Sequence, residues 1–563
     1  MKRPTIKEKE HRHFIENIIL EDLESGKIKG AVLRFPPEPN GHLHIGHAKA
    51  ICVNFGLARD NNWPCHLRMD DTNPEKEESE YIESIKEDVK WLGFDWGNNF
   101  FHASDYFDQI YLYTLELIKK GLAYVDSQSA DDIKNQRGSL TEGGNISPFR
   151  NRTVEENLKI FTEMKDGKYP NGAHVLRAKI DMSSPNMNLR DPVLYRIKHS
   201  EHPHVGNKWC IYPMYDYTHP ISDALEHITH SLCTLEFEDH RPLYDWCINH
   251  LPVPSKPRQI EFARLNLNYT VTSKRKLLQL VKEKYVEGWD DPRLNTIKGL
   301  RRRGVPPEAI VNFCDYISVG KKDTIIDYSI FENYIRDYLN KIAKRYMGVV
   351  NPLKVEISNW EESKIELIDA PLISDDESAG SRNLHFGKYL YIEQDDFLEN
   401  PPPPKKWFRL GPGRSVRLRY GPIITVDSFE KDSAGQITLL KCSYVPGSFK
   451  GASPEGAPNV KGIIHWVNQK HCVEIPARFY DRLFTAENPD GDKEKNFLDF
   501  INPQSLKNQK IWAEAEIQKI KPGERIQLER IAYFVADEKD SKLNSPVLNR
   551  TATLKDTWKK MTE

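Results

Sequence analysis

The sequence predicts a multidomain protein in which an α/β half is followed by an all-β half. Over the first 120 residues, strand-like apolar runs alternate with amphipathic helical stretches, which is typical of a parallel, Rossmann-like sheet. The alternation lapses between about 122 and 208 and then resumes, so we expect an insertion within the sheet domain. After about 348, short apolar-alternating runs between Gly, Pro and Asp clusters predict two C-terminal β-barrels.

Length and composition limit the class of protein. A chain of 563 residues is too long for one core, so we expect three or four domains. No apolar run of about 18 residues exists, and the first residues contain no apolar signal region. We therefore expect a cytoplasmic protein with no membrane partner. None of the eight cysteines lie two to four residues apart, which predicts reduced thiols and no metal site.

The charge balance argues against bulk attraction to nucleic acid. The chain has 80 basic and 82 acidic residues, a net charge of −2. Any nucleic-acid binding must therefore depend on local basic clusters. Two clusters stand out, at 298–303 and 405–419, although a single cluster is more often an ordinary solvated surface.

Periodicity places the elements of the first half. We expect helices over 12–25, 48–55, 82–92 and 106–120 and strands over 31–35 and 65–69. The sheet pattern resumes at 208–217, and further strands are expected over 231–237 and 258–266. Residues 277–345 are mainly helical in pattern.

The first candidate site is the segment 34–47, with the sequence Arg-Phe-Pro-Pro-Glu-Pro-Asn-Gly-His-Leu-His-Ile-Gly-His. Gly41 and Gly46 allow close approach of the backbone where a strand turns into a helix, and the first helical N–H groups point at an anion there. His44 and His47 add donors that can lie against a transferring phosphate. Alone, the segment predicts only that a nucleotide binds.

Three further features are weaker when taken singly. Asp70 follows the strand 65–69 and could meet a positive group of a substrate, but a turn or cap aspartate is nearly as common. The basic loop 271–276 opens a helix and could bind phosphate. Leu140, between Gly138 and Gly143, is expected at an exposed loop tip, which alone means little.

Together these segments resemble a known family. His44-Ile-Gly-His47 and Val271-Thr-Ser-Lys-Arg275 resemble the two signatures of class I aminoacyl-tRNA synthetases. The segments 35–41, 70–74, 207–216 and 234–237 are similar to those of bacterial-type glutaminyl-tRNA synthetases, in the glutamyl/glutaminyl subgroup. The resemblance implies ATP-dependent ligation of L-glutamine to the 3′ end of tRNA(Gln) through a glutaminyl-adenylate, with release of AMP and pyrophosphate.

The resemblance also implies a domain plan. Residues 1–108 and 213–276 would be the two halves of the Rossmann-like catalytic domain, with a tRNA acceptor-binding domain, 109–212, inserted between them. A helical subdomain would follow over 277–347. Two anticodon-binding β-barrels would occupy 348–563, the distal one roughly over 393–485.

Site roles follow from the same resemblance. His44, His47 and Lys274 would be catalytic, and Arg34, Asp70, Tyr215 and Cys233 would bind glutamine. The ATP site would comprise Glu38, Pro39, Asn40, His44, Ile45, Gly46, His47, Ala48, Lys49, Ala50, Thr234, Arg264, Leu265, Thr272, Ser273 and Lys274. ATP would bring Mg²⁺ as its substrate complex, with no permanent cofactor.

The resemblance assigns three residues to tRNA: Leu140, Asp239 and Arg345. Leu140 would act as an apolar wedge that opens the first base pair. Asp239 would accept from a guanine amino group in the shallow groove of A-form RNA. The family is usually monomeric, and we expect a monomer.

One departure and three alternatives accompany this interpretation. Thr272 stands where the family usually has methionine, but Ser273 and Lys274 remain, so we expect activity to survive. A glutamyl-tRNA synthetase shares the signatures. The β-barrel half argues against the many bacterial glutamyl enzymes with a helical anticodon half, whereas eukaryotic-like and archaeal-like glutamyl enzymes also have barrels, and against those the pair Tyr215 and Cys233 favours the glutamine enzyme. An adenylating ligase without RNA would leave the insertion and barrels unexplained. A catalytically silent RNA-binding relative is disfavoured because both histidines and Lys274 are present.

Overall fold

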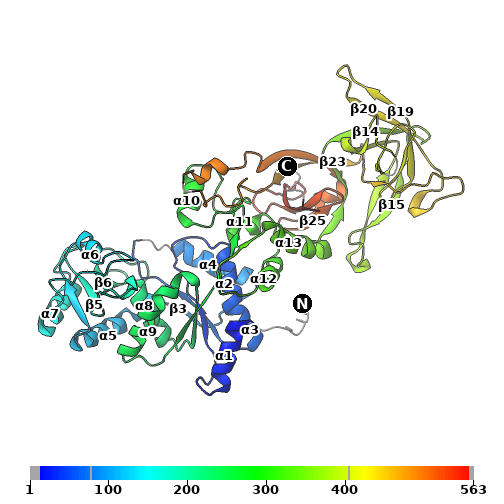
Figure 1. Cartoon of the computed structure of the whole chain (residues 1–563). Helices are drawn as coiled ribbons and strands as arrows, with labels where there is room; N and C mark the ends of the chain where they lie inside the picture. The colour runs from blue at the N-terminus through cyan, green and yellow to red at the C-terminus, as the bar shows by residue number, and fades with distance from the viewer. Residues whose placement is uncertain (1–12, 76–78, 404–405, 493, 557–563) are drawn as a thin grey trace. The chain divides into compact units, whose positions relative to one another are not determined.

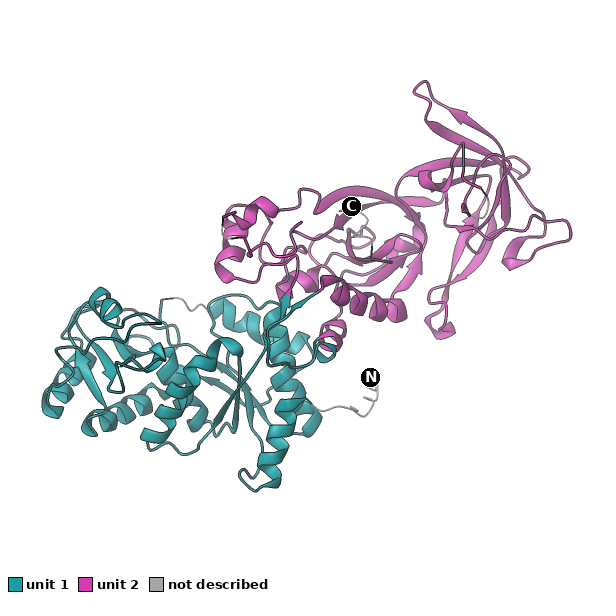
Figure 2. Cartoon of the chain, in the orientation of Figure 1, with its two compact units in different colours: residues 1–266, 314–326 teal, residues 267–313, 327–563 magenta. Residues whose placement is uncertain are grey.

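The computed structural model describes residues 13–75, 79–403, 406–492 and 494–556 (Figure 1). The chain divides into two compact units (Figure 2). Unit 1 comprises residues 1–266 and 314–326, and unit 2 comprises residues 267–313 and 327–563.

A parallel sheet forms the centre of unit 1. Its strands β1 (Leu33–Phe35), β2 (Cys65–Met69) and β3 (Phe100–His102) pair in parallel in this order. Strands β8 (His230–Thr234) and β9 (Arg258–Phe262) form a second parallel pair. The N–H of Thr229 donates to the carbonyl of Val32 at 3.0 Å, which places β8 beside β1. Strands from both sides of the insertion therefore share one parallel arrangement, as the sequence predicts.

The predicted helices of the first half are present. They are α1 (Phe14–Glu24), α2 (Ile45–Ile51), α4 (Ser79–Trp91) and α5 (Phe107–Lys119). Helix α2 begins three residues before the predicted start because His44 caps it. It continues through a π-helical turn, Cys52–Gly56, into α3 (Leu57–Asn61). Helices α8 (Tyr215–Leu225) and α9 (Arg241–His250) complete the sheet domain, with a 3₁₀ turn, Leu235–His240, leading into α9.

The insertion has its own antiparallel sheet, in the order β4-β5-β6-β7. Its elements are β4 (Ala123–Asp126), α6 (Ala130–Gln136), α7 (Val154–Lys165), β5 (Val175–Ala178), β6 (Val193–Ile197) and β7 (Ile211–Pro213). The prediction that the parallel sheet resumes at 208–217 was wrong, because Ile211 pairs antiparallel with Ile197. Three apolar residues cannot indicate which partner strand they will meet, and β7 closes the sheet of the insertion.

Unit 2 combines helices with two seven-stranded curled sheets, so the predicted fold class is confirmed. The helices are α10 (Lys274–Lys282), α11 (Ile297–Arg302), most of α12 (Pro307–Tyr316) and α13 (Tyr328–Ile342). One sheet contains β12 (Lys344–Tyr346), β13 (Gly348–Val349), β23 (Cys472–Tyr480), β24 (Leu506–Glu514), β25 (Arg525–Leu528), β26 (Ala532–Ala536) and β27 (Leu548–Thr553). The other contains β14 (Pro352–Ile357), β17 (Tyr389–Glu393), β18 (Ser415–Leu418), β19 (Ile423–Lys431), β20 (Ile437–Tyr444), β21 (Ile463–Ile464) and β22 (Val467–Asn468). A separate hairpin pairs β15 (Glu366–Pro371) with β16 (Ser381–Phe386). Each curled sheet encloses an apolar core of its own.

The basic segment 298–303 is partly structural. Arg302 is buried and pairs with Asp537 at 3.1 Å and with Asp540 at 3.2 Å. Arg303 is also buried and donates to the carbonyl of Thr551 at 3.0 Å. These two arginines tie α11 to the C-terminal strands and are not part of an exposed patch. In the described part of the chain, no helix is long and apolar enough to cross a membrane.

Candidate active site

The turn after β1 presents two histidine rings in a fixed orientation. The Nδ1 of His44 accepts the N–H of Gly46 at 3.1 Å, and the Nδ1 of His47 accepts the N–H of His44 at 3.1 Å. The two ring centroids lie 3.9 Å apart. Because each Nδ1 accepts, the proton of each neutral ring lies on Nε2. Both rings therefore keep an Nε2–H donor for another group.

Burial keeps these rings neutral. It lowers the pKa of His47 to about 4, and it lowers the pKa of His44 well below its ordinary value, with a further contribution from His47. At neutral pH both side chains are therefore hydrogen-bond donors without a charge. Gly46 is needed for this arrangement, since a Cβ there would lie 2.8 Å from Cε1 of His44.

Asp70, at the carboxyl end of β2, is a buried carboxylate with 3% of its surface exposed. Its N–H donates to the carbonyl of Pro37 at 2.9 Å, which fixes it against the turn after β1. Within the described residues, no hydrogen-bond donor reaches either carboxylate oxygen. Burial raises its pKa to about 6, although Arg68 and His219 oppose the rise. Buried polar groups are normally satisfied, so an unsatisfied carboxylate here is suited to bind a cationic ligand.

Tyr215 lies close to this carboxylate, and Cys233 lies close to Arg34. Tyr215 begins α8, and its ring stacks on His219 with centroids 5.3 Å apart. Burial, followed by the charge of Asp70, holds the pKa of Tyr215 well above its ordinary value, so the phenol stays protonated. Burial raises the pKa of the Cys233 thiol, but Arg34 and His219 together lower it more, and the net shift is downward. The Sγ of Cys233 lies 3.6 Å from Nη2 of Arg34.

Arg34 is fully buried in a charged network below the site. Its Nε donates to Asp223 at 3.1 Å, and its Nη1 donates to the carbonyl of Leu232 at 2.8 Å. Arg68, on the neighbouring strand, donates to Asp223 at 2.8 Å and to Glu226 at 3.1 Å. The carboxylates of α8 thus neutralise the arginines of β1 and β2.

Residues of the predicted adenosine end surround the start of α2. The Nζ of Lys49 donates to the carbonyl of Ala263 at 2.8 Å, and burial lowers the pKa of this lysine. Lys49 thereby ties α2 to the segment after β9, where Arg264 is exposed and Leu265 is buried. Thr234 ends β8 and donates to Glu236 at 2.8 Å. In the turn before α2, Glu38 is exposed, Pro39 is buried, and the N–H of Asn40 donates to the carbonyl of Glu38.

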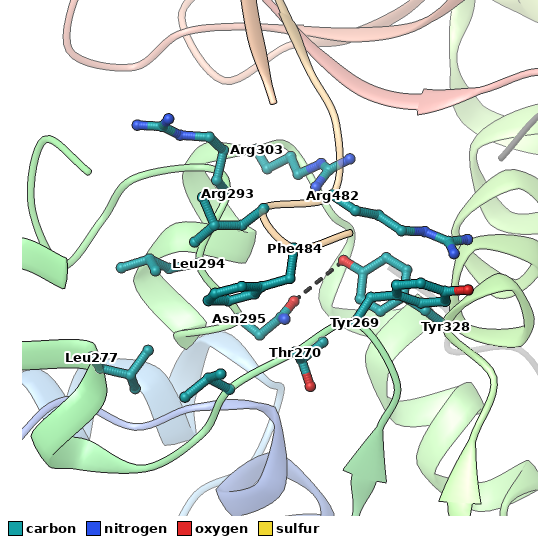
Figure 3. Close-up of a pocket in the computed structure, with 12 residues that line it drawn as sticks. Tyr269, Thr270, Leu277, Arg293, Leu294, Asn295, Arg303, Tyr328, Arg482 and Phe484 are labelled. Atoms are coloured by element: carbon teal, nitrogen blue, oxygen red, sulfur yellow. Dashed lines mark hydrogen bonds between the residues drawn. The ribbon is translucent and has the colours of Figure 1, made fainter. Parts of the chain in front are cut away.

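The second signature loop belongs to unit 2. Ser273 is the N-cap of α10, Lys274 is its first residue and is exposed, and Thr272 is half-buried. The base of the loop is packed: Val271 and Leu277 belong to one apolar cluster with Phe484. Figure 3 shows a pocket at this base, where Tyr328 donates to Asn295 at 3.2 Å.

The residues predicted to bind tRNA lie at separate places on the chain. Leu140 is 83% exposed at a loop tip in the insertion. Asp239 is exposed at the end of the 3₁₀ turn after β8. Arg345, on β12 in unit 2, donates to the hydroxyl of Ser374 and to Asn340.

Comparisons with family models and with known proteins identify the family. The sequence matches the model of the catalytic domain of class I tRNA synthetases (E and Q) over residues 31–341. Models of the anticodon-binding domain of the same synthetases match residues 343–445 and 463–537. The chain is 55% identical over 548 residues to glutamine–tRNA ligase of Pseudomonas putida, covering 97% of this chain and 96% of the relative. It is 54% identical to the glutamine–tRNA ligase of Bradyrhizobium diazoefficiens, covering 98% and 97%. The chain is a class I tRNA synthetase of the E and Q group.

For this class I synthetase, unit 1 brings together most residues that the sequence assigns to the substrates. His44, His47, Asp70, Tyr215 and Cys233 come from four segments that meet around the carboxyl ends of β1, β2 and β8. Sequence reasoning missed Arg68, His219, Asp223 and Glu226. The available signal was the placement of arginines in otherwise apolar strands, because a buried arginine needs a buried carboxylate elsewhere.

Proposed function

We propose that the protein is a glutamine–tRNA ligase that joins L-glutamine to the 3′ end of tRNA(Gln). The observation that carries the proposal is Asp70, a buried carboxylate whose oxygens accept no hydrogen bond within the described residues and whose N–H binds the turn that leads to the histidine pair. An amino acid brings an α-ammonium group, which can satisfy both oxygens. The high identity to curated glutamine–tRNA ligases supports glutamine as that amino acid.

The reaction has two steps. A carboxylate oxygen of glutamine attacks the α-phosphorus of ATP, the bond to the β-phosphate oxygen breaks, and pyrophosphate leaves. A terminal ribose hydroxyl of the tRNA then attacks the carbonyl carbon of the glutaminyl-adenylate, losing its proton as AMP leaves. ATP enters as its Mg²⁺ complex, so the metal belongs to the substrate.

The protein stabilises negative charge in the first step. The Nε2–H groups of His44 and His47 donate to phosphate oxygens, and Lys274 supplies a positive charge to the leaving phosphates. Removing one preorganised donor of this type typically lowers the rate by about 10²–10³-fold. Lys49 and Leu265 shape the adenosine end, and Thr234 and Arg264 offer polar contacts there.

The pocket selects the uncharged side chain. Tyr215 is protonated, and the guanidinium of Arg34 is already engaged by Asp223 and by main-chain oxygen. His219, whose pKa is raised to about 9, also engages Asp223, so a glutamate carboxylate would have to compete with Asp223 for these cations. A buried carboxylate left unpaired costs several kcal/mol. Glutamine can satisfy neutral donors and acceptors without that cost.

The remaining surfaces take the RNA, and the enzyme acts as a monomer. Leu140 opens the first base pair and Asp239 reads the acceptor stem. Arg345 contacts the inner arm. In the sheet β21-β18-β19-β20-β14-β17-β22, a hollow lined by Lys406, Trp407, Phe408, Arg409, Lys461 and Ile463 combines cations with aromatic rings. Such surfaces stack and contact single-stranded bases, as an anticodon requires.

The test is pyrophosphate exchange with glutamine and with glutamate, each with and without tRNA(Gln). Exchange with glutamine that requires tRNA is the expected result, because members of the glutamyl/glutaminyl subgroup activate the amino acid only with tRNA bound. Exchange with glutamate alone would reassign the chain to glutamate. The variant Lys274→Ala should lower turnover by about a hundredfold or more with little change in tRNA affinity.

A further inference from the structure

The segment 184–190 of the insertion connects two residues that the proposed function assigns to the acceptor end of tRNA. One is Leu140, at the tip of the loop 138–143, and the other is Asp239, at the end of the 3₁₀ turn after β8. The inference below rests on that proposed function. It concerns the residues that hold these two groups in place.

Arg190 closes the base of the Leu140 loop. This arginine is 2% exposed, and its Nη1 lies 2.9 Å from the carbonyl oxygen of Arg137 and 2.8 Å from those of Ser139 and Glu142. Its Nε donates to the carbonyl of Ser184 at 2.6 Å. One buried cation therefore binds the entering and leaving strands of the loop to the start of the segment 184–190.

The other end of the segment holds the main chain at Asp239. The side-chain amide of Asn186 donates to the carbonyl of Asp239 at 2.7 Å, and that of Asn188 donates to the same oxygen at 3.1 Å. The side chain of Asn186 also accepts the N–H of Asn188 at 2.9 Å, which orients the two amides together. Asp239 thus exposes its carboxylate while its backbone is fixed.

The loop 138–143 closes on itself through the N–H of Ser139, which donates to the carbonyl of Glu142 at 3.1 Å. The hydroxyl oxygen of Ser139 accepts the N–H of Glu142 at 3.2 Å. Leu140 itself is exposed at the tip. A wedge that separates a base pair must resist displacement while it unstacks the bases. If only its own hydrogen bonds held the loop, it would lose conformational freedom when it binds the RNA. This entropy cost would reduce the free energy available for opening the base pair.

We propose that the segment 184–190 is a positioning bracket, in which Arg190, Asn186 and Asn188 hold the Leu140 tip and the Asp239 carboxylate in one rigid frame. The bracket sets the distance between the point where the first base pair is opened and the point where the stem is read. These three are positioning residues and do not themselves contact the reacting atoms.

The charging test uses the full-length protein and two tRNA(Gln) transcripts, one with a paired and one with a mismatched first base pair. Arg190→Met should lower kcat/KM for the paired transcript about tenfold, as expected for the loss of a charge-assisted hydrogen bond, and that for the mismatched transcript much less. Arg190→Lys should restore part of the loss. In a Leu140→Ala background, the effect of Arg190→Met should disappear, because the two residues act as one unit.

Asn186→Ala with Asn188→Ala gives a milder test that leaves the buried arginine intact. Its effect should disappear in an Asp239→Ala background. The matched control is Arg152→Met: Arg152 also donates to a main-chain carbonyl in the insertion, that of Val125 at 2.9 Å. Among the described residues, none of the hydrogen bonds of Arg152 reaches the loop 138–143 or Asp239. This variant should charge both transcripts as the parent does.

Hydrogen exchange of the loop 138–143 tests the bracket without RNA. Exchange at the amides of Ser139 and Glu142 should become faster in Arg190→Met and stay unchanged in Arg152→Met. Unchanged exchange in Arg190→Met would overturn the bracket, as would an equal loss of charging for both transcripts. If the parent fails to charge tRNA(Gln) with glutamine, the proposed function fails. Faster loop exchange in Arg190→Met would then still show that Arg190 holds the loop.

Discussion

At the scale of single residues, Asp70 opposes stability and serves binding. Its pKa is about 6 in the folded protein against an ordinary value of 3.8, so the folded state binds the proton more tightly than the unfolded state. Such a group destabilises the fold: the cost is absent below the unfolded pKa, grows as the pH rises between the two pKa values, and is complete above the folded pKa. The ammonium group of a bound ligand removes this cost, and the free energy so recovered contributes to binding.

Replacement of Asp70 by asparagine should therefore separate the two effects. At pH 7.5, Asp70→Asn should raise the free energy of unfolding of the ligand-free protein by up to about 3 kcal/mol, and near pH 4 it should change little. The KM for glutamine should rise roughly 10–100-fold, because a charged hydrogen bond is lost. Urea denaturation at the two pH values measures the free energy of unfolding, and pyrophosphate-exchange kinetics measure the KM for glutamine. A variant that is less stable at pH 7.5 would contradict the burial argument.

The same residue predicts the acid limb of the pH profile. In the parent, kcat/KM for glutamine should fall as the pH drops through about 6, because the free enzyme loses the Asp70 carboxylate. His47 does not contribute in this window, since its pKa of about 4 leaves it neutral. In the Asp70→Asn variant, kcat/KM for glutamine should be lower at every pH and should no longer fall near pH 6. A limb that persists in the variant would assign it to another group.

At the scale of elements, the start of α2 depends on one glycine. His44 caps the helix through its Nδ1, and its ring occupies the space that a side chain at position 46 would need. The signature of this turn is thus a packing requirement as well as a set of donors. The helix itself is held elsewhere, through the Lys49 contact to Ala263 and the buried side chains of Ile45 and Ile51.

Gly46→Ala should consequently abolish most activity while the protein stays folded. The new Cβ would lie 2.8 Å from Cε1 and 3.0 Å from Nδ1 of His44, so the ring must turn and release its hydrogen bond to the backbone. We expect a loss of about 10²-fold or more in turnover, against a loss of about 1 kcal/mol in stability for a missing cap.

Gly56→Ala is the control for that substitution. Gly56 ends the π-helical turn with φ of −65°, and a Cβ there meets nothing within 4 Å among the described residues. Alanine should be tolerated at this position, and the rate of pyrophosphate exchange should stay close to that of the parent. Equal losses in both variants would mean that any side chain in this helical stretch is harmful, and the role given to the His44 ring would be wrong.

At the scale of the whole molecule, the sequence predicted elements better than their partners. The strand 65–69 was predicted to the residue because the segment Cys-His-Leu-Arg-Met stops at two aspartates. The partners of strands and side chains were harder to predict. Strand β7 is too short to indicate which sheet it joins, and the hydrogen bond from Arg34 to Asp223 joins residues 189 positions apart. The sequence suggests a surface cluster at Arg302 and Arg303 because the carboxylate of Asp537 and the carbonyl of Thr551, which bind them, lie more than 230 residues away.

The candidate site shows the same division. The histidine pair and Asp70 could be predicted because each follows a strand end in a recognisable segment. The network of Arg68, His219 and Asp223 could not, since the charges compensate one another only after β2 and α8 have packed together. The bracket at Arg190 is invisible in sequence because its partners are main-chain carbonyls, which every residue has.

Charge at the molecular scale leads to the last prediction. With a net charge of −2, the protein must attract RNA through local cations, and the hollow around Trp407 and Arg409 is the clearest such place in the described part of unit 2. Lys461→Ala removes one of its charges. The slope of log K for tRNA against log salt should become shallower by about 0.7, the value for one contact to a single strand.

The control is Lys354→Ala, which removes an exposed lysine from β14 of the same sheet, outside the residues that line the hollow. Filter binding or fluorescence titration of tRNA(Gln) between about 50 and 200 mM salt measures both slopes. Only the Lys461 variant should show the shallower slope. Because phosphate contacts position the RNA without doing chemistry, its kcat at saturating tRNA should remain that of the parent. Equal slopes for the two variants would mean that attraction to RNA is spread over the sheet, and the hollow would lose its assigned role.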